Sequence, residues 1–286
     1  MSVPSKRIVV VTGATGRQGS SVARTLLRDG WQVRALTRNP ASEKAQALAA
    51  LGADVVQGDM TDRQSLEHVF DSAYGVFSVQ NPYLSSPDSE IQQGKLVANL
   101  AKEAGVQHLV YASAGVGKPT GVGSWDSKLA VEAHMKALGI PLTVLRPMAF
   151  MELMTDKDFY PAVSTWHLMP RLMGETRPVV WLAASDMGAI VTRVLAAPEQ
   201  YIGQDIKLAS DVKTLEECRR LYRDILGKKP PRFRMPLWLF KRFVGDDLPT
   251  MWTWLRTADL ELNTGPTLAI YPEALTVESW LRTRAI

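Results

Sequence analysis

Three glycines near the start of the chain could do recognisable chemistry. Gly13, Gly16 and Gly19 follow a β-branched run at residues 8–11 and precede a segment with helical periodicity. In a strand–turn–helix context, the first glycine permits the turn, the second lets backbone N–H groups approach a pyrophosphate, and the third lets the helix pack on the strand. The helix N-terminus adds about half a positive charge. This pattern indicates a dinucleotide phosphate site, and the alternative is a tight turn that binds nothing.

The end of the second apolar run indicates which dinucleotide the glycine loop would bind. An acidic residue there would hold the ribose 2′-hydroxyl of NAD. Residues 36–40 read LTRNP and contain no carboxylate, whereas Arg38 offers a planar guanidinium suited to the 2′-phosphate of NADP(H). After the third run, Asp59 is placed to meet the adenine amino group and Asp62 to cap the next helix. The sequence therefore favours NADP(H) as cofactor.

Lys128 is the one candidate catalytic residue. Many reductases that bind a nicotinamide dinucleotide use a tyrosine as proton donor, four residues before a lysine. In this chain the residue four positions before Lys128 is Ser124. Lys128 opens a predicted helix, where a cation is unfavourable without an anionic partner or a ligand, so we expect it to contact the ribose or the substrate. Quinones and enones form stabilised anions on accepting a hydride and need no strong donor. Tyr83 or Tyr111 is the alternative donor, reaching the site from another element.

Other catalytic or metal chemistry lacks the necessary residues. His68, His108, His134 and His167 are scattered without the spacing of metal ligands, so no metal site is expected. Cys218 is the only cysteine, which rules out an intrachain disulfide and favours a reducing compartment, by default the cytoplasm.

Predicted strands and helices, which must position these residues, alternate through the first half of the chain. Short apolar runs occur at residues 8–11, 32–36, 54–57, 75–79, 108–112 and 142–145, and helix-period segments at 19–28, 42–51, 63–70, 90–103 and 127–138. This alternation predicts an α/β fold with a Rossmann-type, doubly wound parallel sheet. After Pro147, frequent prolines interrupt the chain, and the regular alternation of strands and helices ends. We predict an NADP(H)-binding Rossmann domain at 1–150 and a smaller α/β lobe for substrate or partner at 151–286, from which some segments can return to the sheet.

Charge and hydropathy restrict the partners. The net charge of +4 is too small a surplus to indicate nucleic acid, and a phosphorylated small molecule would satisfy it. No apolar run reaches the length of a transmembrane helix, and the run after Lys6 and Arg7 is too short for a signal peptide. Residues 228–243, KKPPRFRMPLWLFKRF, hold six basic residues and no acidic one. They predict an amphipathic helix over a substrate crevice, or else a surface for a protein, an anionic membrane or nucleic acid.

Several of these motifs together resemble the NmrA-like family, atypical members of the short-chain dehydrogenase/reductase superfamily. The motifs are TGATGRQG at 12–19, LTRNP at 36–40, GDMTD at 58–62, WDSK at 125–128 and RPMAFME at 146–152. The resemblance implies an NADP(H)-binding Rossmann domain, in a family that holds both redox-sensing regulators and NADPH-dependent quinone or related reductases. It places the following residues on cofactor-contacting positions: Gly13, Ala14, Thr15, Gly16, Arg17, Gln18, Arg38, Asp59, Met60, Val79, Gln80, Asn81, Lys128, Phe150, Met151 and Glu152. Leu153 departs from the pattern, because many relatives have asparagine there.

Two functions remain open from the sequence. The first is an NADPH-dependent oxidoreductase that acts on quinone-like or other small acceptors without the tyrosine–lysine pair. The second is a non-catalytic NADP(H) redox sensor that regulates a protein partner. A homodimer is compatible with both.

Overall fold

The computed structural model describes residues 7–81, 86–156, 164–231 and 234–285. The chain forms two compact units. The first unit comprises Met1–Gly117, Ser127–Arg146 and Ala184–Ile206. The second unit comprises Lys118–Asp126, Pro147–Ala183 and Lys207–Ile286. The segment Ala184–Ile206 thus joins the first unit although it lies beyond residue 150, and the domain boundary at that residue stays a prediction.

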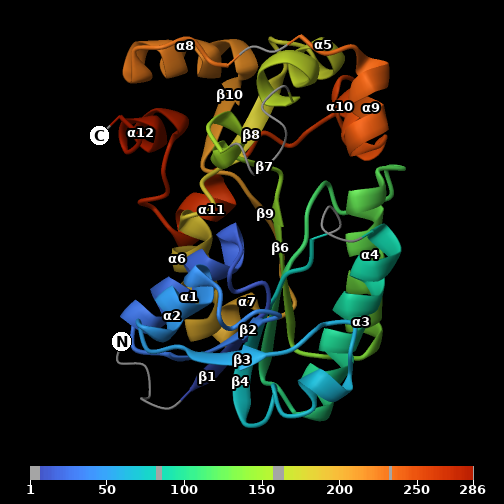
Figure 1. Ribbon diagram of the computed structural model, residues 1–286, viewed down its shortest axis with the longest axis vertical. Coiled ribbons are helices and arrows are strands. Elements are labelled where there is room, and N and C mark those ends of the chain that lie inside the picture. Colours follow the sequence, from blue (N-terminus) through green and yellow to red (C-terminus); the bar gives the residue numbers. More distant parts are fainter. Residues whose placement is uncertain (1–6, 82–85, 157–163, 232–233, 286) are drawn as a thin grey trace. The chain divides into compact units, whose positions relative to one another are not determined.

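A seven-stranded sheet, in the order β3-β2-β1-β4-β5-β6-β9, forms the centre of the first unit (Figure 1). All five adjacent pairs from β3 to β6 are parallel. The predicted Rossmann-type α/β sheet is therefore confirmed, and each of the six predicted strands is present. The strands are β1 (Ile8–Val11), β2 (Gln32–Thr37), β3 (Asp54–Gln57), β4 (Ala73–Ser78), β5 (His108–Ala112), β6 (Leu142–Pro147) and β9 (Asp205–Leu208).

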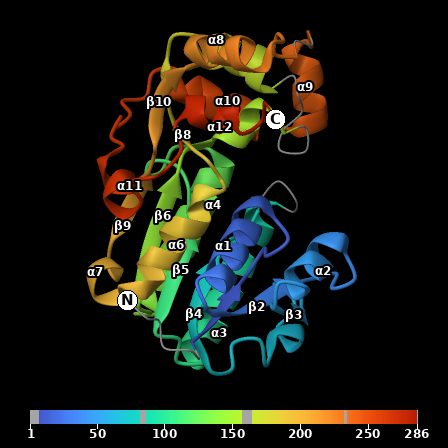
Figure 2. The same cartoon turned by 90° about the vertical axis from the view of Figure 1, so that its left-hand side faces the viewer.

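Helices cover both faces of this sheet. Val97 of α3 (Pro87–Glu103) and Val131 of α4 (Gly123–Ala137) share one buried cluster with Val10, Val76 and Leu109 of the strands. These two helices approach closely at Gly94, where a Cβ would lie 2.6 Å from a methyl group of Val131. The helices α1 (Arg17–Arg28) and α6 (Asp186–Ala196) lie side by side on the other face (Figure 2). The first unit also contains α2 (Glu43–Ala49) and α7 (Pro198–Tyr201).

Contacts at one glycine hold α6 against α1. A Cβ at Gly188 would lie only 2.3 Å from Oγ1 of Thr25, so glycine is required there. Ser21 Oγ donates to the carbonyl oxygen of Ser185 at 2.6 Å and accepts from the backbone N–H of Gly188 at 3.2 Å. The α6 helix therefore fixes the helix that follows the glycine loop.

The prediction of a helix at residues 63–70 is wrong. Only one turn of 3₁₀-helix forms there, at Gln64–Leu66. The hydroxyl of Ser65 donates toward the carbonyl oxygens of Asp62 and Asp59 at 2.8 and 3.2 Å and accepts from the backbone N–H of Asp59 at 2.9 Å. These local bonds compete with an α-helical ladder and favour a short, tight turn.

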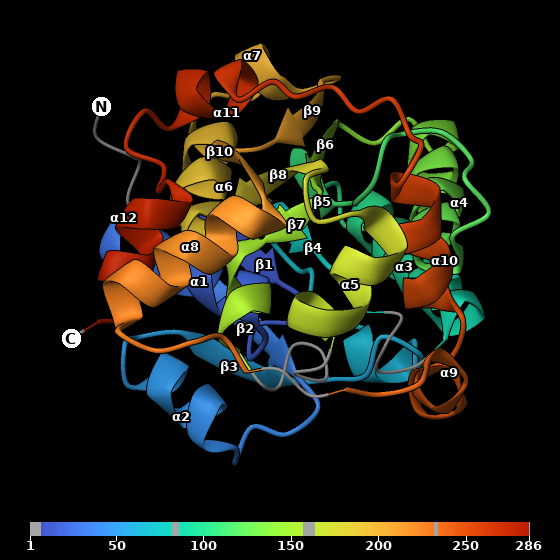
Figure 3. The same cartoon turned by 90° about the horizontal axis from the view of Figure 1, so that it is seen from above.

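The second unit contains a three-stranded sheet, in which β8 (Pro178–Leu182) lies between β7 (Ala149–Phe150) and β10 (Asp211–Thr214). Its β10–β8 pair is antiparallel and its β7–β8 pair is parallel. Figure 3 shows α12 beside α8 and α10 beside α5 within this unit. The helical segments of the unit are η2 (Met151–Met154), η3 (Ser164–Leu168), α5 (Met169–Met173), α8 (Leu215–Leu226), α9 (Leu237–Val244), α10 (Asp247–Leu255), α11 (Gly265–Ile270) and α12 (Val277–Arg282).

The basic and aromatic segment at residues 228–243 contributes the α9 helix. Phe240 is fully buried and its ring lies 5.9 Å from that of Trp252, whereas Trp238 and Phe243 are 70% and 74% exposed. An amphipathic helix is thus present over Leu237–Val244 only, with two of its aromatic side chains in solvent, and its predicted place over a substrate crevice stays a prediction. Across the described ranges of the chain, no helix is both long and apolar enough to cross a bilayer.

Candidate functional site

The glycine loop lies where the direction of the strand order reverses. The chain runs outward from β1 to β3 on one side and resumes with β4 on the other side of β1. In open α/β sheets, ligands bind at the carboxyl ends of the strands at such a point. Thr12 joins the two strand ends, because its Oγ1 donates to the carbonyl oxygen of Val79 at 3.0 Å and accepts from the Val79 N–H at 2.8 Å. The fold therefore brings Gly13 and Val79 together.

The three glycines of the loop have different structural roles. Gly13 has φ +57°, a left-handed conformation that favours glycine. A Cβ at Gly19 would lie 2.2 Å from the carbonyl oxygen of Gly13, so a side chain there would disrupt the turn. Gly16 is exposed, and its Cβ would meet only that same carbonyl oxygen, at 3.2 Å. Gly16 therefore leaves the outer side of the turn bare, which is the property that a close phosphate contact requires.

No side chain of the residues that the structure describes caps the N-terminus of α1. Its N-cap is Gly16, and no acidic residue stands in its first turn. By contrast, Ser42 and Ser86 cap α2 and α3 with their hydroxyl oxygens. An anion is a natural partner for the backbone N–H groups at such a helix N-terminus. Ala14 and Thr15 lie in this turn, and Arg17 and Gln18 begin the helix.

Arg38 and Asp59 follow the ends of β2 and β3. Arg38 is exposed, and its charge acts on Asp59. The Asp59 carboxylate accepts bonds from the backbone N–H and the hydroxyl of Thr61, both at 2.8 Å. These bonds, with a smaller contribution from Arg38, outweigh the effect of burial and lower the pKa of Asp59, so the group stays ionised. The predicted adenine contact of Asp59 stays a prediction.

Gln80 supplies a buried acceptor next to this loop. Its side-chain amide donates to Ser78 Oγ at 3.0 Å and lies 3.8 Å from the sulfur of Met60. Its other side-chain atom, Oε1, is buried, and no described residue donates a hydrogen bond to it. A buried amide oxygen without a donor fits a ligand that carries one. Asn81, the next predicted residue, is exposed.

Lys128 does not open its helix as predicted, because α4 begins at Gly123. It has an anionic partner that sequence reasoning did not identify. Its Nζ lies 2.5 Å from Glu90 Oε1 and donates to the carbonyl oxygen of Gln80 at 3.3 Å. The Ser127 hydroxyl donates to the second oxygen of Glu90, also at 2.5 Å, and Glu90 has no exposed surface. One signal was available in the sequence. Glu90 occupies the same helical face as the buried residues of α3 at 94, 97, 98 and 101.

A second buried network ties the sheet to α4. The Arg146 guanidinium, 1% exposed, pairs with Glu132 at 2.5 and 2.7 Å and with Asp205 at 2.5 and 2.6 Å. The hydroxyl of Ser113 donates to Glu132 and accepts from Arg146. Burial acts to lower the pKa of Arg146, but its bonds to Asp205 and Glu132 raise it above its ordinary value. The guanidinium therefore stays charged and joins β5, β6, β9 and α4.

Of the two alternative tyrosines, the structure describes Tyr111, which is not placed as an accessible proton donor. Tyr111 is fully buried, and its hydroxyl has no hydrogen-bond partner among the residues that the structure describes. Burial, and then the charges of Glu90 and Glu132, raise the pKa of Tyr111 well above its ordinary value. Tyr83 lies outside the described residues.

Three predicted contact residues belong to the second unit. Phe150 ends β7, and Met151 and Glu152 begin η2. The Glu152 carboxylate accepts from the indole N–H of Trp280 at 3.3 Å and lies 3.8 Å from the guanidinium of Arg284. Glu152 thus has partners within its own unit, and its contact with a cofactor stays a prediction.

The side chains of His108, His134 and Cys218 are hydrogen-bonded or buried within the fold. His108 and His134 lie 2.8 Å from Thr143 Oγ1 and Asn99 Oδ1, and burial lowers the pKa of His108 to about 4. Burial raises the pKa of the Cys218 thiol. Where the chain is described, no three histidine, cysteine or carboxylate side chains are grouped to hold a metal ion.

Comparisons with known proteins agree with the geometry of the fold. The model of the NmrA-like family matches residues 5–280. An NmrA-like family domain-containing oxidoreductase of Aspergillus campestris is 33% identical over 319 aligned positions, which cover 100% of this chain and 92% of that protein.

Two solved structures show the likeness of fold. NmrA, a negative transcriptional regulator in complex with NADP, superposes with a TM-score of 0.80 at 21% identity and covers 98% of this chain and 95% of its own. An NADPH-dependent quinone oxidoreductase from Escherichia coli has a TM-score of 0.74 at 22% identity, over 97% of this chain and 99% of its own. With the match to the family model along nearly its whole length, this chain belongs to the NmrA-like family.

Proposed function

We propose that this protein is an NADPH-dependent oxidoreductase that reduces quinone-like or other small, activated acceptors. The observation that carries the proposal is the exposed Gly16 at the uncapped N-terminus of α1, at the point where the strand order reverses. This arrangement suits a pyrophosphate. The relatives and structural neighbours that are described as oxidoreductases support the same class of reaction.

Each residue of the first-unit site has a distinct role in this proposal. The backbone N–H groups after Gly13 bind the pyrophosphate, and Arg38 binds the 2′-phosphate. NADPH supplies the hydride when it is bound. Gln80 Oε1 accepts a hydrogen bond from the cofactor, and Glu90 holds the Lys128 ammonium in position to contact the ribose. Lys128 is thus a binding and orienting group.

Arg38→Ala is expected to weaken NADPH binding on the order of 10- to 100-fold, since a hydrogen bond to a charged group contributes about 1.5 to 3 kcal/mol. NADH lacks the 2′-phosphate, so its affinity should not change. Fluorescence titration of both nucleotides measures the effect. Arg28→Ala, at an arginine whose side chain is 69% exposed, is the control and should bind NADPH as the wild type does. Equal loss of NADPH and NADH affinity in Arg38→Ala would contradict the assignment.

Quinones should be reduced much faster than unactivated ketones, because a quinone forms a stabilised anion and Lys128 has no tyrosine at the donor position. Steady-state oxidation of NADPH with menadione, an enone, benzaldehyde and cyclohexanone tests this order. Rapid reduction of cyclohexanone that is lost in Tyr83→Phe or Tyr111→Phe would contradict it and indicate a conventional reductase.

A non-catalytic redox sensor is the second candidate. The absence of a tyrosine four residues before Lys128 favours it. In that case, the NADP(H)-loaded protein would bind a regulated protein partner, with or without forming a homodimer. Tight NADPH binding together with no turnover of any acceptor in the same assay would favour the sensor over the reductase.

A further inference from the structure

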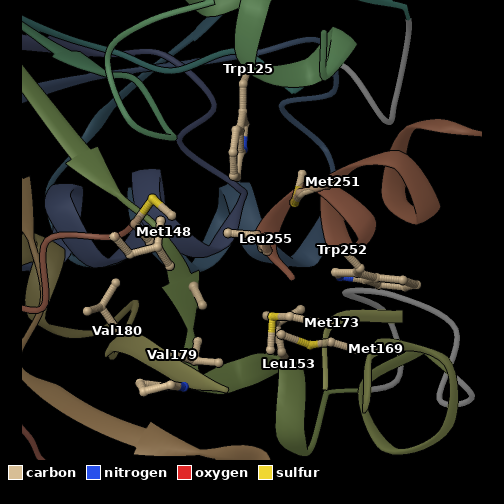
Figure 4. A pocket seen from close by; sticks show the side chains of 13 residues that line it. Trp125, Met148, Leu153, Met169, Met173, Val179, Val180, Met251, Trp252 and Leu255 are labelled. Atoms are coloured by element: carbon tan, nitrogen blue, oxygen red, sulfur yellow. The ribbon is translucent and has the colours of Figure 1, made fainter. Parts of the chain in front are cut away.

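The second unit contains an apolar pocket with an unusual lining (Figure 4). The first turn of α4, the strands β7 and β8, and the helices α5 and α10 contribute to it. Its empty space, counted with the solvent at its open mouth, is about 480 Å³. Six of its thirteen lining residues are tryptophan or methionine: Trp125, Trp252, Met148, Met169, Met173 and Met251.

The lining excludes charged ligands. The seven remaining residues are alanine, leucine, proline and valine, so the part of the lining that the structure describes contains no ionisable side chain. A charge transferred from water into such surroundings would have no counter-charge to offset its desolvation. Among the described lining residues, the side-chain hydrogen-bond donors are the indole N–H groups of Trp125 and Trp252. A ligand that fits these groups is uncharged and carries few hydrogen-bonding atoms.

The lining also favours a flat aromatic ligand. Trp125 is 4% exposed and its ring packs edge-on against Trp254, with centroids 5.5 Å apart. Trp252 packs against Phe240 with ring centroids 5.9 Å apart and the ring planes tilted by 35°. Rings held in this way offer fixed surfaces for stacking. The methionine side chains are flexible and polarisable, so they adapt to the edge of an aromatic ring and make favourable sulfur–aromatic contacts.

We propose that this pocket binds the flat, uncharged aromatic part of a small molecule, the rest of which lies at the open mouth. The inference goes beyond the proposed function, because it concerns binding by side chains of the second unit and requires neither NADPH nor turnover. Neutral naphthoquinones belong to this chemical class, so the pocket and the proposed reaction select similar molecules on independent grounds.

A matched pair of fluorescent probes tests whether the pocket binds uncharged ligands in preference to charged ones. N-phenyl-1-naphthylamine is neutral, and 8-anilino-1-naphthalenesulfonate has the same ring skeleton with one negative charge. We expect the neutral probe to bind the full-length protein saturably, with one site, and at least tenfold more tightly than the sulfonate. Menadione should displace it. Equal affinity for the two probes would overturn the proposal.

A matched pair of variants locates the binding. Leu260 lines the pocket, whereas Leu262, two residues further along, is 45% exposed and does not. Leu260→Asp should weaken binding of the neutral probe at least tenfold, and Leu262→Asp should leave it unchanged. Leu153→Asp, at a second, half-buried lining position, is the replacement if thermal melting shows that Leu260→Asp is unfolded. Unchanged probe affinity in both folded lining variants would overturn the proposal.

The proposed function and the pocket can fail separately in these experiments. Arg38→Ala should bind the neutral probe as the wild type does, while its NADPH affinity falls. Probe binding that fails in a protein with normal NADPH affinity would reject the pocket alone. Normal probe binding without NADPH binding would reject the cofactor site alone.

Discussion

Gly16→Val is expected to abolish measurable NADPH binding while leaving the protein folded. The Gly16 backbone has φ −85° and ψ 175°, which any residue adopts, and the residue is exposed. A valine side chain would instead occupy the space in which the pyrophosphate meets the backbone N–H groups. Loss of two hydrogen bonds to a charged group, at roughly 1.5 to 3 kcal/mol each, corresponds to about 100-fold or more in the dissociation constant. Calorimetric titration and thermal melting measure the two effects.

Gly19→Ala is the control for this variant. Its Cβ would lie 2.2 Å from the carbonyl oxygen of Gly13, a backbone atom that cannot move without opening the turn. We therefore expect Gly19→Ala to lower the melting temperature, and Gly16→Val to melt close to the wild type. If Gly16→Val bound NADPH with wild-type affinity, the loop would be a tight turn without a phosphate site.

Glu90→Gln is expected to reduce the free energy of unfolding by about 3 to 5 kcal/mol, because it leaves the Lys128 ammonium buried without its counter-charge. The side chains of Glu90 and Lys128 are 0% and 10% exposed, and their charged atoms lie 2.5 Å apart. The Ser127 hydroxyl loses its carboxylate acceptor as well. Urea denaturation measures the loss. The double variant Glu90→Gln/Lys128→Met removes both charges and should recover most of the stability.

Glu103→Gln provides the matched control on the same helix. Glu103 pairs with Arg63 at 2.6 Å, but both side chains are more than half exposed. Solvent screens such a pair, so its loss should cost less than about 1 kcal/mol. If Glu90→Gln and Glu103→Gln had the same effect on unfolding, the buried pair would not contribute to stability as argued, and its role in orienting Lys128 would also lose its physical basis.

Local patterns in the sequence were sufficient to predict the strands that are buried on both faces of the sheet. The run Ile8–Val11 consists of β-branched residues, and the glycine spacing after it fixes both the turn and the start of α1. The edge strand β9 was missed because Asp205 and Lys207 alternate with apolar residues over only four positions. The turn at Gln64–Leu66 was mistaken for a longer helix, because hydrophobic periodicity does not register the bonds of Ser65.

Contacts between distant parts of the chain account for what the sequence did not reveal. The sequence identified Lys128 but not its partner Glu90, which lies on a different helix. It identified neither the pairing of Arg146 with Asp205 nor the apolar pocket, whose lining comes from segments more than one hundred residues apart, such as those of Trp125 and Met251. Such contacts depend on tertiary packing, which no local pattern encodes.

The packing of α6 on α1 has implications for biosynthesis. A growing chain leaves the ribosome from its N-terminus, so α1 is made long before Ala184–Ile206. Until that segment has been synthesised, α1 is not covered by α6, whose close packing on α1 depends on Gly188. A fragment that stops at residue 150 would expose this surface and be prone to aggregate. We therefore expect cofactor binding to follow the packing of Ala184–Ile206 onto the first unit, and NADPH to stabilise chains in which this segment has already packed.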